Sequence, residues 1–197
     1  MPKRVFSIIA VLVCVVLIAP GGVRAAPPID DGFSAARKIE ARHFSVFIAP
    51  GLDDGALVQR LDIGPNHKIL AGQSLSGANF SSTSLGDLLD ALFIWATGVL
   101  DMQLPSYRGN IKITANEAQL KDVFQKLYGR EGSSQKSFYI YELNTIYIAA
   151  EDFTKEVLGH EIDHAITSNF FVVQPPEKVA EVLSGYIEFQ LRKISKQ

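Results

Sequence analysis

The stretch VLGHEIDHAIT, residues 157–167, holds two histidines four positions apart, with a glutamate directly after the first. On an α-helix, residues four apart are rotated by about 40° and lie one turn from each other. The imidazoles of His160 and His164 should therefore project the same way and can bind one Zn²⁺. Glu161 would flank the metal and can take a proton from a water molecule. This H-E-x-x-H pattern predicts a zinc site with a general base beside it.

A catalytic zinc needs a third protein ligand and an open coordination position. Cys14 is the only cysteine and lies in an N-terminal apolar run, and the other two histidines lie far upstream in an expected strand and loop. The helix expected after the motif is a better source, because Glu177, Glu181 and Glu188 fall within about 40° of one another on it. Spacing alone does not choose between Glu181 and Glu188.

The sequence HEIDH, followed by KVAEVLSGYIE, resembles the gluzincin group of zinc metallopeptidases. In that group a second helix similar to W-L-x-E-G-L-A-x-Y-x-E follows the H-E-x-x-H helix. The resemblance implies that Glu181 is the third zinc ligand, and it places Tyr186 and Glu188 on the Tyr and the second Glu of the pattern.

The resemblance covers residues 138–191 and implies a zincin-like fold, in which an edge strand above the metal binds extended substrate. The segment TIYIAA, residues 145–150, stands where that strand is expected. The sequence departs from the pattern at Lys178-Val179, where the group has Trp-Leu, and at Val182, where it has Gly. Neither departure touches a ligand.

Further roles follow for the residues around the motif. Glu161 is expected to act as the general base, and Tyr186 to donate a hydrogen bond to the oxyanion; a packed aromatic is the alternative for Tyr186. Asp163 and Glu188 are candidates to orient the histidines. For Asp163, a position on a solvated helix face is the favoured interpretation.

The remaining sequence indicates an α+β domain that positions these residues. Alternating apolar residues predict strands over 43–50 and 107–115 and a hairpin over 137–150. Apolar residues at helical spacing predict helices over 53–63, 84–102, 116–129, 152–168 and 176–193. The expected sheet is small, twisted and mainly antiparallel. The segment Gly64–Ser84, rich in Gly, Ser and Asn, is expected to be a long loop.

The N-terminus has the pattern of a secretory signal peptide, with a basic head, an apolar run over residues 5–19 and small residues after it. We expect residues 1–25 to be removed, 26–40 to form a linker and 41–197 to form the zincin-like domain. The mature chain would then be secreted or periplasmic and free of disulfides. An uncleaved N-terminal membrane anchor is the alternative.

The net charge is −2 and both signs are mixed along the chain, so no basic stripe indicates nucleic acid. The expected function is a peptidase that holds one Zn²⁺ and cleaves a peptide or protein substrate through a metal-activated water, without stable membrane insertion after signal cleavage. Two alternatives keep the same site. One is an amide hydrolase acting on peptidoglycan, and the other is a zincin-fold binding protein that has lost turnover.

Overall fold

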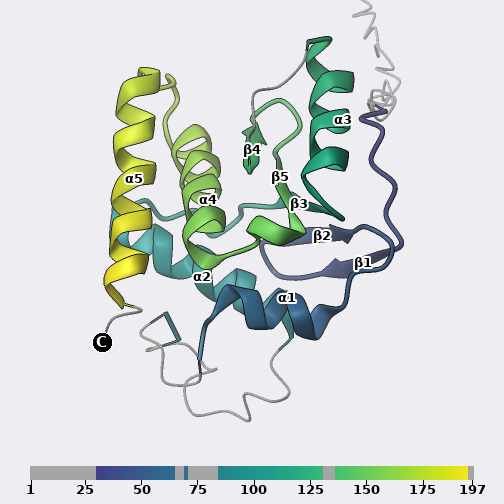
Figure 1. Ribbon diagram of the computed structural model, residues 1–197. Helices are drawn as coiled ribbons and strands as arrows, with labels where there is room; N and C mark the ends of the chain where they lie inside the picture. The colour runs from purple at the N-terminus through teal and green to yellow at the C-terminus, as the bar shows by residue number, and fades with distance from the viewer. Residues whose placement is uncertain (1–29, 65–68, 71–83, 131–135, 195–197) are drawn as a thin grey trace, which may run out of the picture.

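The computed structural model of the chain describes residues 30–64, 69–70, 84–130 and 136–194. They form a five-stranded sheet with helices packed on it, which confirms the predicted α+β class (Figure 1). The elements in chain order are β1 (Arg37–Glu40), β2 (Phe44–Ile48), α1 (Asp54–Leu61), α2 (Leu85–Leu100), β3 (Gly109–Thr114), α3 (Glu117–Tyr128), β4 (Ser137–Ile140), β5 (Thr145–Ala149), the 3₁₀ helix η2 (Ala150–Asp152), α4 (Lys155–Phe170) and α5 (Glu177–Ile194). Within these ranges every helix is too short or too polar to span a bilayer.

The sheet is mixed, so the expectation of a mainly antiparallel sheet was wrong. Its strand order is β1-β2-β3-β5-β4. The strands β2, β3 and β5 are parallel neighbours, whereas β1 and β4 pair antiparallel at the two edges. Parallel neighbours need a crossover connection, and α1, α2 and α3 lie in these connections. The apolar pattern of a strand predicts its existence but not the direction of its neighbour.

The expected hairpin over residues 137–150 is present as β4 and β5, which pair from Ser137 and Ile148 to Ile140 and Thr145. Asn144 turns the chain between them with a φ of 45°, a left-handed conformation that Asn tolerates. The edge strand is β4, however, and not the segment 145–150. β5 lies between β3 and β4, and all of its residues are buried because both of its faces are covered.

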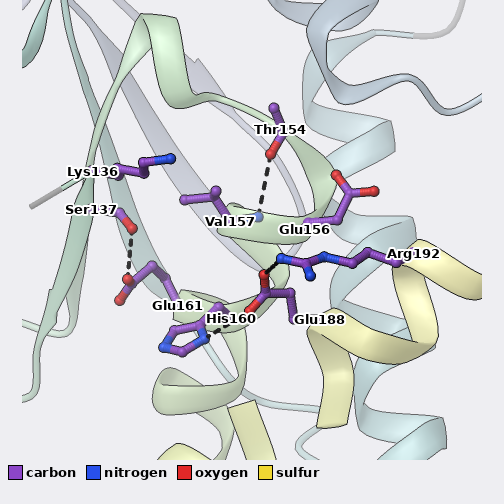
Figure 2. A pocket seen from close by; sticks show the side chains of 9 residues that line it. All are labelled: Lys136, Ser137, Thr154, Glu156, Val157, His160, Glu161, Glu188 and Arg192. Atoms are coloured by element: carbon purple, nitrogen blue, oxygen red, sulfur yellow. Dashed lines mark hydrogen bonds and ion pairs between the residues drawn. The ribbon is translucent and has the colours of Figure 1, made fainter. Parts of the chain in front are cut away.

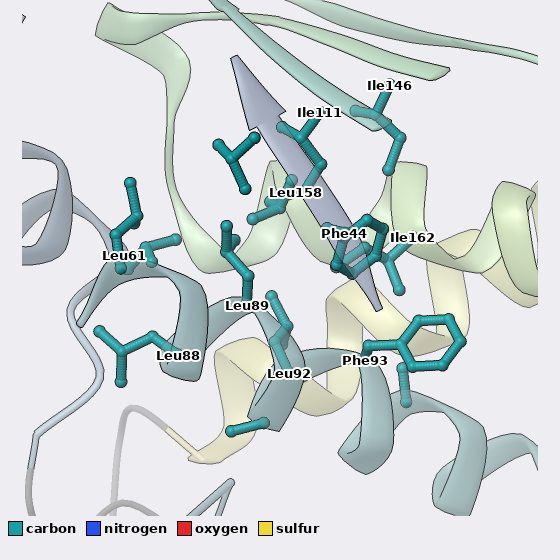
Figure 3. Packing of buried hydrophobic residues seen from close by; sticks show 14 of the residues in the cluster. Phe44, Leu61, Leu88, Leu89, Leu92, Phe93, Ile111, Ile146, Leu158 and Ile162 are labelled. Atoms are coloured by element: carbon teal, nitrogen blue, oxygen red, sulfur yellow. The ribbon is translucent and has the colours of Figure 1, made fainter. Parts of the chain in front are cut away.

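The main hydrophobic core fills the space between one face of the sheet and the helices α2 and α4 (Figure 3). Phe44 of β2, Ile111 of β3 and Ile146 of β5 belong to it, together with Leu89 of α2 and Ile162 of α4. A smaller cluster joins the opposite face to α3. The apolar side of α4 is thus held against the sheet, and its other side is left for the motif's polar residues.

The segment 26–40, expected to be a linker, contains β1 and a buried aspartate. The Asp31 carboxylate pairs with Lys112 of β3 and accepts a hydrogen bond of 2.6 Å from the Tyr147 hydroxyl of β5. The chain therefore packs against the sheet before residue 41. The predicted signal peptide, 1–25, and most of the predicted loop Gly64–Ser84 lie outside the described residues.

The helices α4 and α5 pack side by side (Figure 1). They approach at Gly159, where an added Cβ would overlap the side chain of Leu191 and lie 3.3 Å from Ile187 Cγ2. A glycine is required here by this close approach rather than by backbone conformation. The contact sets how near α5 comes to the histidines of α4.

We predict that Gly159→Ala lowers the free energy of unfolding by about 1–3 kcal/mol, because the added methyl group forces the two helices apart. Urea unfolding of the purified protein measures this change. Gly98→Ala is the matched control, since a Cβ at Gly98 in α2 meets nothing within 4 Å. The free energy of unfolding of Gly98→Ala should be unchanged or higher by up to about 1 kcal/mol. Equal unfolding midpoints for the two variants would contradict the tight contact.

Candidate metal centre

The helix α4 carries the histidine motif and is capped at its N-terminus by Thr154, whose hydroxyl accepts a hydrogen bond from the backbone N–H of Val157. With its apolar side against the core, the helix presents His160 and His164 toward α5. Their Nε2 atoms lie 3.2 Å apart. The same-side projection predicted from their spacing is present.

The helix α5 brings the Glu181 carboxylate to both imidazoles. Oε1 lies 3.4 Å from His164 Nε2, and Oε2 lies 3.7 Å from His160 Nε2. Ligand atoms around a tetrahedral zinc stand about 3.3 Å apart, given zinc–ligand distances of about 2.0–2.1 Å, so these separations fit that ion. Within the described part of the chain, these three residues are the one group of at least three potential ligands that lie within 4.8 Å of one another.

Glu188 lies on the other side of His160. Its Oε2 is 3.7 Å from His160 Nδ1, and its carboxylate pairs with Arg192 one turn further along α5. It therefore approaches the ring nitrogen that faces away from the three-residue group. Of the two carboxylates that the spacing left open, Glu181 is the one that the structure places beside both histidines.

Glu161 is buried between α4 and the edge strand β4, where the Ser137 hydroxyl donates a hydrogen bond of 2.7 Å to its carboxylate. Burial raises the pKa of Glu161 to about 7, and the charge of Glu181 adds to this rise, while Ser137 and His160 oppose it. A carboxyl group that titrates near neutral pH can both accept and return a proton. This property fits the expected general base.

Asp163 is fully buried, so the interpretation that it lies on a solvated face was wrong. It accepts hydrogen bonds from Ser184 of α5 at 2.7 Å and from Thr167 at 3.4 Å, and burial raises its pKa to about 6. Ser184 Oγ also lies 3.4 Å from His164 Nδ1. Asp163 thus reaches His164 through Ser184. Burial lowers the pKa of His164, which favours the neutral imidazole that a metal requires.

Tyr186 does not approach the three-residue group. It follows Glu181 by five residues, a rotation of about 140° around α5, and it is 45% exposed. The structure therefore gives no support to the expected hydrogen bond from Tyr186 to an oxyanion. Tyr139 and Tyr141 line the surface beside His164 instead. They lie outside the motif, and their only signal in the sequence was their place in the preceding hairpin.

Two hollows meet at the centre, and Ser137, His160 and Glu161 line both of them. Figure 2 shows the first hollow, whose other lining residues are Lys136, Thr154, Glu156, Val157, Glu188 and Arg192. The second hollow is lined further by Phe138, Tyr139, Tyr141, His164, Ser168 and Glu181. We call the two together the β4 groove, because residues of β4 line both halves. The first hollow is lined by His160 of the three-residue group, and the second by all three of its residues.

Comparison with known proteins gives no relative of this chain. No protein-family model, no curated protein and no solved structure matches it. The functional assignment therefore depends on the geometry of the described residues and on their chemistry.

We predict that Glu181→Ala lowers zinc affinity by at least about 100-fold, because it removes one of the three candidate ligands. Glu188→Ala should lower the affinity by no more than about 10–100-fold, because Glu188 contacts only the candidate ligand His160. Competition with a chromophoric chelator measures both affinities. Unchanged affinity in Glu181→Ala combined with loss of binding in Glu188→Ala would show that the ligand is Glu188.

Proposed function

We propose that the chain is a zinc-dependent peptidase with a zincin-like active site. One observation carries this proposal. His160 and His164 of α4 and Glu181 of α5 each offer a ligand atom, and these three atoms lie within 4.8 Å of one another. The buried Glu161 follows the first of these ligands directly in the chain. Two imidazoles and one carboxylate match the donor set of a catalytic zinc that keeps one position open.

Each residue around the centre has a distinct task in this proposal. A zinc ion held by the three ligands would act as a Lewis acid on the scissile carbonyl. Glu161 takes the proton of the attacking water and returns it to the leaving amine. Ser137 holds the Glu161 carboxylate in place, and Ser184 supports the ring of His164.

The β4 groove supports a peptide as the substrate. β4 is an edge strand, so a further extended chain can pair with its backbone. One hollow lies on each side of His160 and Glu161, so an extended chain bound in both would cross the centre rather than end there. Amide bonds of peptidoglycan present the same reacting group, so cell wall is the alternative substrate.

We also propose that the protein acts outside the cytoplasm, as a secreted or periplasmic enzyme. The predicted signal peptide, 1–25, carries this assignment, and Cys14 within it is the only cysteine of the chain. The remaining chain can form no disulfide and depends on the core described above for its stability.

Glu161→Gln should keep zinc and lose turnover by about 10²–10⁴-fold, because the amide cannot accept the proton. Zinc content, digestion of a peptide library and digestion of purified cell wall are measured on the same samples. Tyr186→Phe is the control and should keep both zinc and turnover. Full activity in Glu161→Gln would refute the general base, and zinc-loaded wild type that cleaves neither substrate would favour a binding protein.

Ser137→Ala should move the acidic limb of the pH–activity profile to higher pH by about one unit. The Ser137 hydroxyl stabilises the ionised form of Glu161, so its loss raises the pKa of that carboxyl group, and activity then requires a higher pH to ionise the base. Ser168→Ala, which alters another serine of the β4 groove, is the matched control and should leave the limb in place. If the acidic limb did not shift in Ser137→Ala, the group whose ionisation sets that limb would not be Glu161.

A further inference from the structure

The outer side of α5 carries an apolar stripe. Val179, Val182, Tyr186 and Phe189 recur at positions i, i+3, i+7 and i+10, and Val182 and Phe189 are 71% and 59% exposed. Figure 1 shows α5 at the left edge of the molecule, with α4 on its inner side. The stripe therefore faces away from the core that the described residues build.

Further exposed apolar residues stand at the end of α4 and in its connection to α5. Phe170, the last residue of α4, and Phe171 are exposed, and Val172 and Val173 are 102% and 82% exposed. Eight of the ten exposed large hydrophobic residues of the described chain lie here or on the stripe. Together they expose on the order of 800 Å², taking about 150–250 Å² for a whole aromatic side chain and somewhat less for valine. The largest apolar patch of a typical monomer is about 300–600 Å².

Gly185 lies beside the stripe in the middle of α5, where glycine costs about 1 kcal/mol relative to alanine. Its φ is not positive, and a Cβ added there would meet nothing within 4 Å. No contact within the described chain thus requires a glycine at this position. At Gly159, by contrast, the absence of a side chain gives α5 room to pack closely against α4. Gly185 leaves similar room for a neighbouring helix on the outer side of α5.

We propose that the stripe forms an interface with the stripe of a second copy, with the two α5 helices antiparallel. The spacing is that of positions a and d in a helix pair. In antiparallel register, Val182 of one copy meets Tyr186 of the other, and Val179 meets Phe189. Each of these pairs joins a small side chain to a large one, and the two-fold symmetry of such an interface repeats each pair once.

The exposed area agrees with this occupant. A stable interface buries about 800 Å² on each partner, of which somewhat more than half is apolar, and the four stripe residues expose on the order of 400 Å². A lipid surface is a poorer match, because amphipathic helices at anionic membranes carry basic residues beside the apolar face. Here two acidic residues, Glu181 and Glu188, stand between Lys178 and Arg192 along the flank of the stripe, so that flank is not basic.

The pairing leaves the metal centre accessible. The stripe is centred about 120° around α5 from Glu181, so the β4 groove opens beside the interface and not into it. Tyr186 then belongs to the contact between copies rather than to catalysis.

Light scattering during size-exclusion chromatography of the full chain tests the pairing. At about 100 µM, well above a Kd of about 1 µM, the wild type should have the mass of a dimer. A dilution series from about 100 µM to about 1 µM measures the Kd, and Val182→Glu should raise it by about 30-fold or more, so that this variant is mostly monomeric at about 10 µM, where the wild type is still mostly dimeric. Tyr128→Glu, which changes another exposed aromatic residue on α3, should remain dimeric. A monomeric wild type overturns the proposal, including the case in which it binds phosphatidylcholine vesicles and Val182→Glu does not.

Crosslinking supplies a second test that does not require a charge at the interface. Gly185→Cys should give a crosslinked dimer with a short bismaleimide, because the two copies of this position lie near the two-fold axis. Gly98→Cys, on α2, and the wild type with Cys14 alone are the controls and should give none. Absence of the Gly185→Cys product would overturn the register. Neither experiment uses zinc or turnover, so their outcome is independent of the proposed peptidase.

Discussion

The close contact between α4 and α5 is the constraint on which the candidate centre depends. His160 and His164 come from one helix and Glu181 from the next, so no local sequence can hold the three together. Gly159 removes the side chain that would separate the helices, and the hydrogen bond from Ser184 to Asp163 fixes their relative position. A shift of one helix along the other would move the carboxylate away from both imidazoles.

This arrangement has an electrostatic cost, because α4 buries two carboxyl groups. Burial raises the pKa of Glu161 to about 7 and that of Asp163 to about 6. A carboxyl group with a raised folded-state pKa binds more protons in the folded than in the unfolded state, so its contribution to stability falls as pH rises from its unfolded pKa through its folded pKa. Ser137 and Ser184 limit this cost by donating one hydrogen bond each. Perturbed acids at such positions are more typical of functional sites than of structural cores.

Much of the centre could be predicted from the sequence, because the spacing of His160 and His164 fixes their common side on any α-helix. The same rule limits the third candidate ligand to one face of α5, but the choice of Glu181 over Glu188 depends on how the helices cross. Helical rotation alone would have excluded Tyr186. The burial of Asp163 could not be predicted, because its partner Ser184 lies on a different helix. The parallel strands and the edge position of β4 likewise depend on contacts between distant segments.

The helix α5 differs from an ordinary surface helix, which needs one apolar side only. Its inner side buries Ile187 and Leu191 against the core, while its outer side exposes a second apolar stripe. Glu181 and Glu188 occupy the polar strip between these two sides and border the β4 groove. A helix with two apolar sides is stabilised fully only when both are covered, so an interface on the outer side would hold Glu181 in place as well as join two molecules.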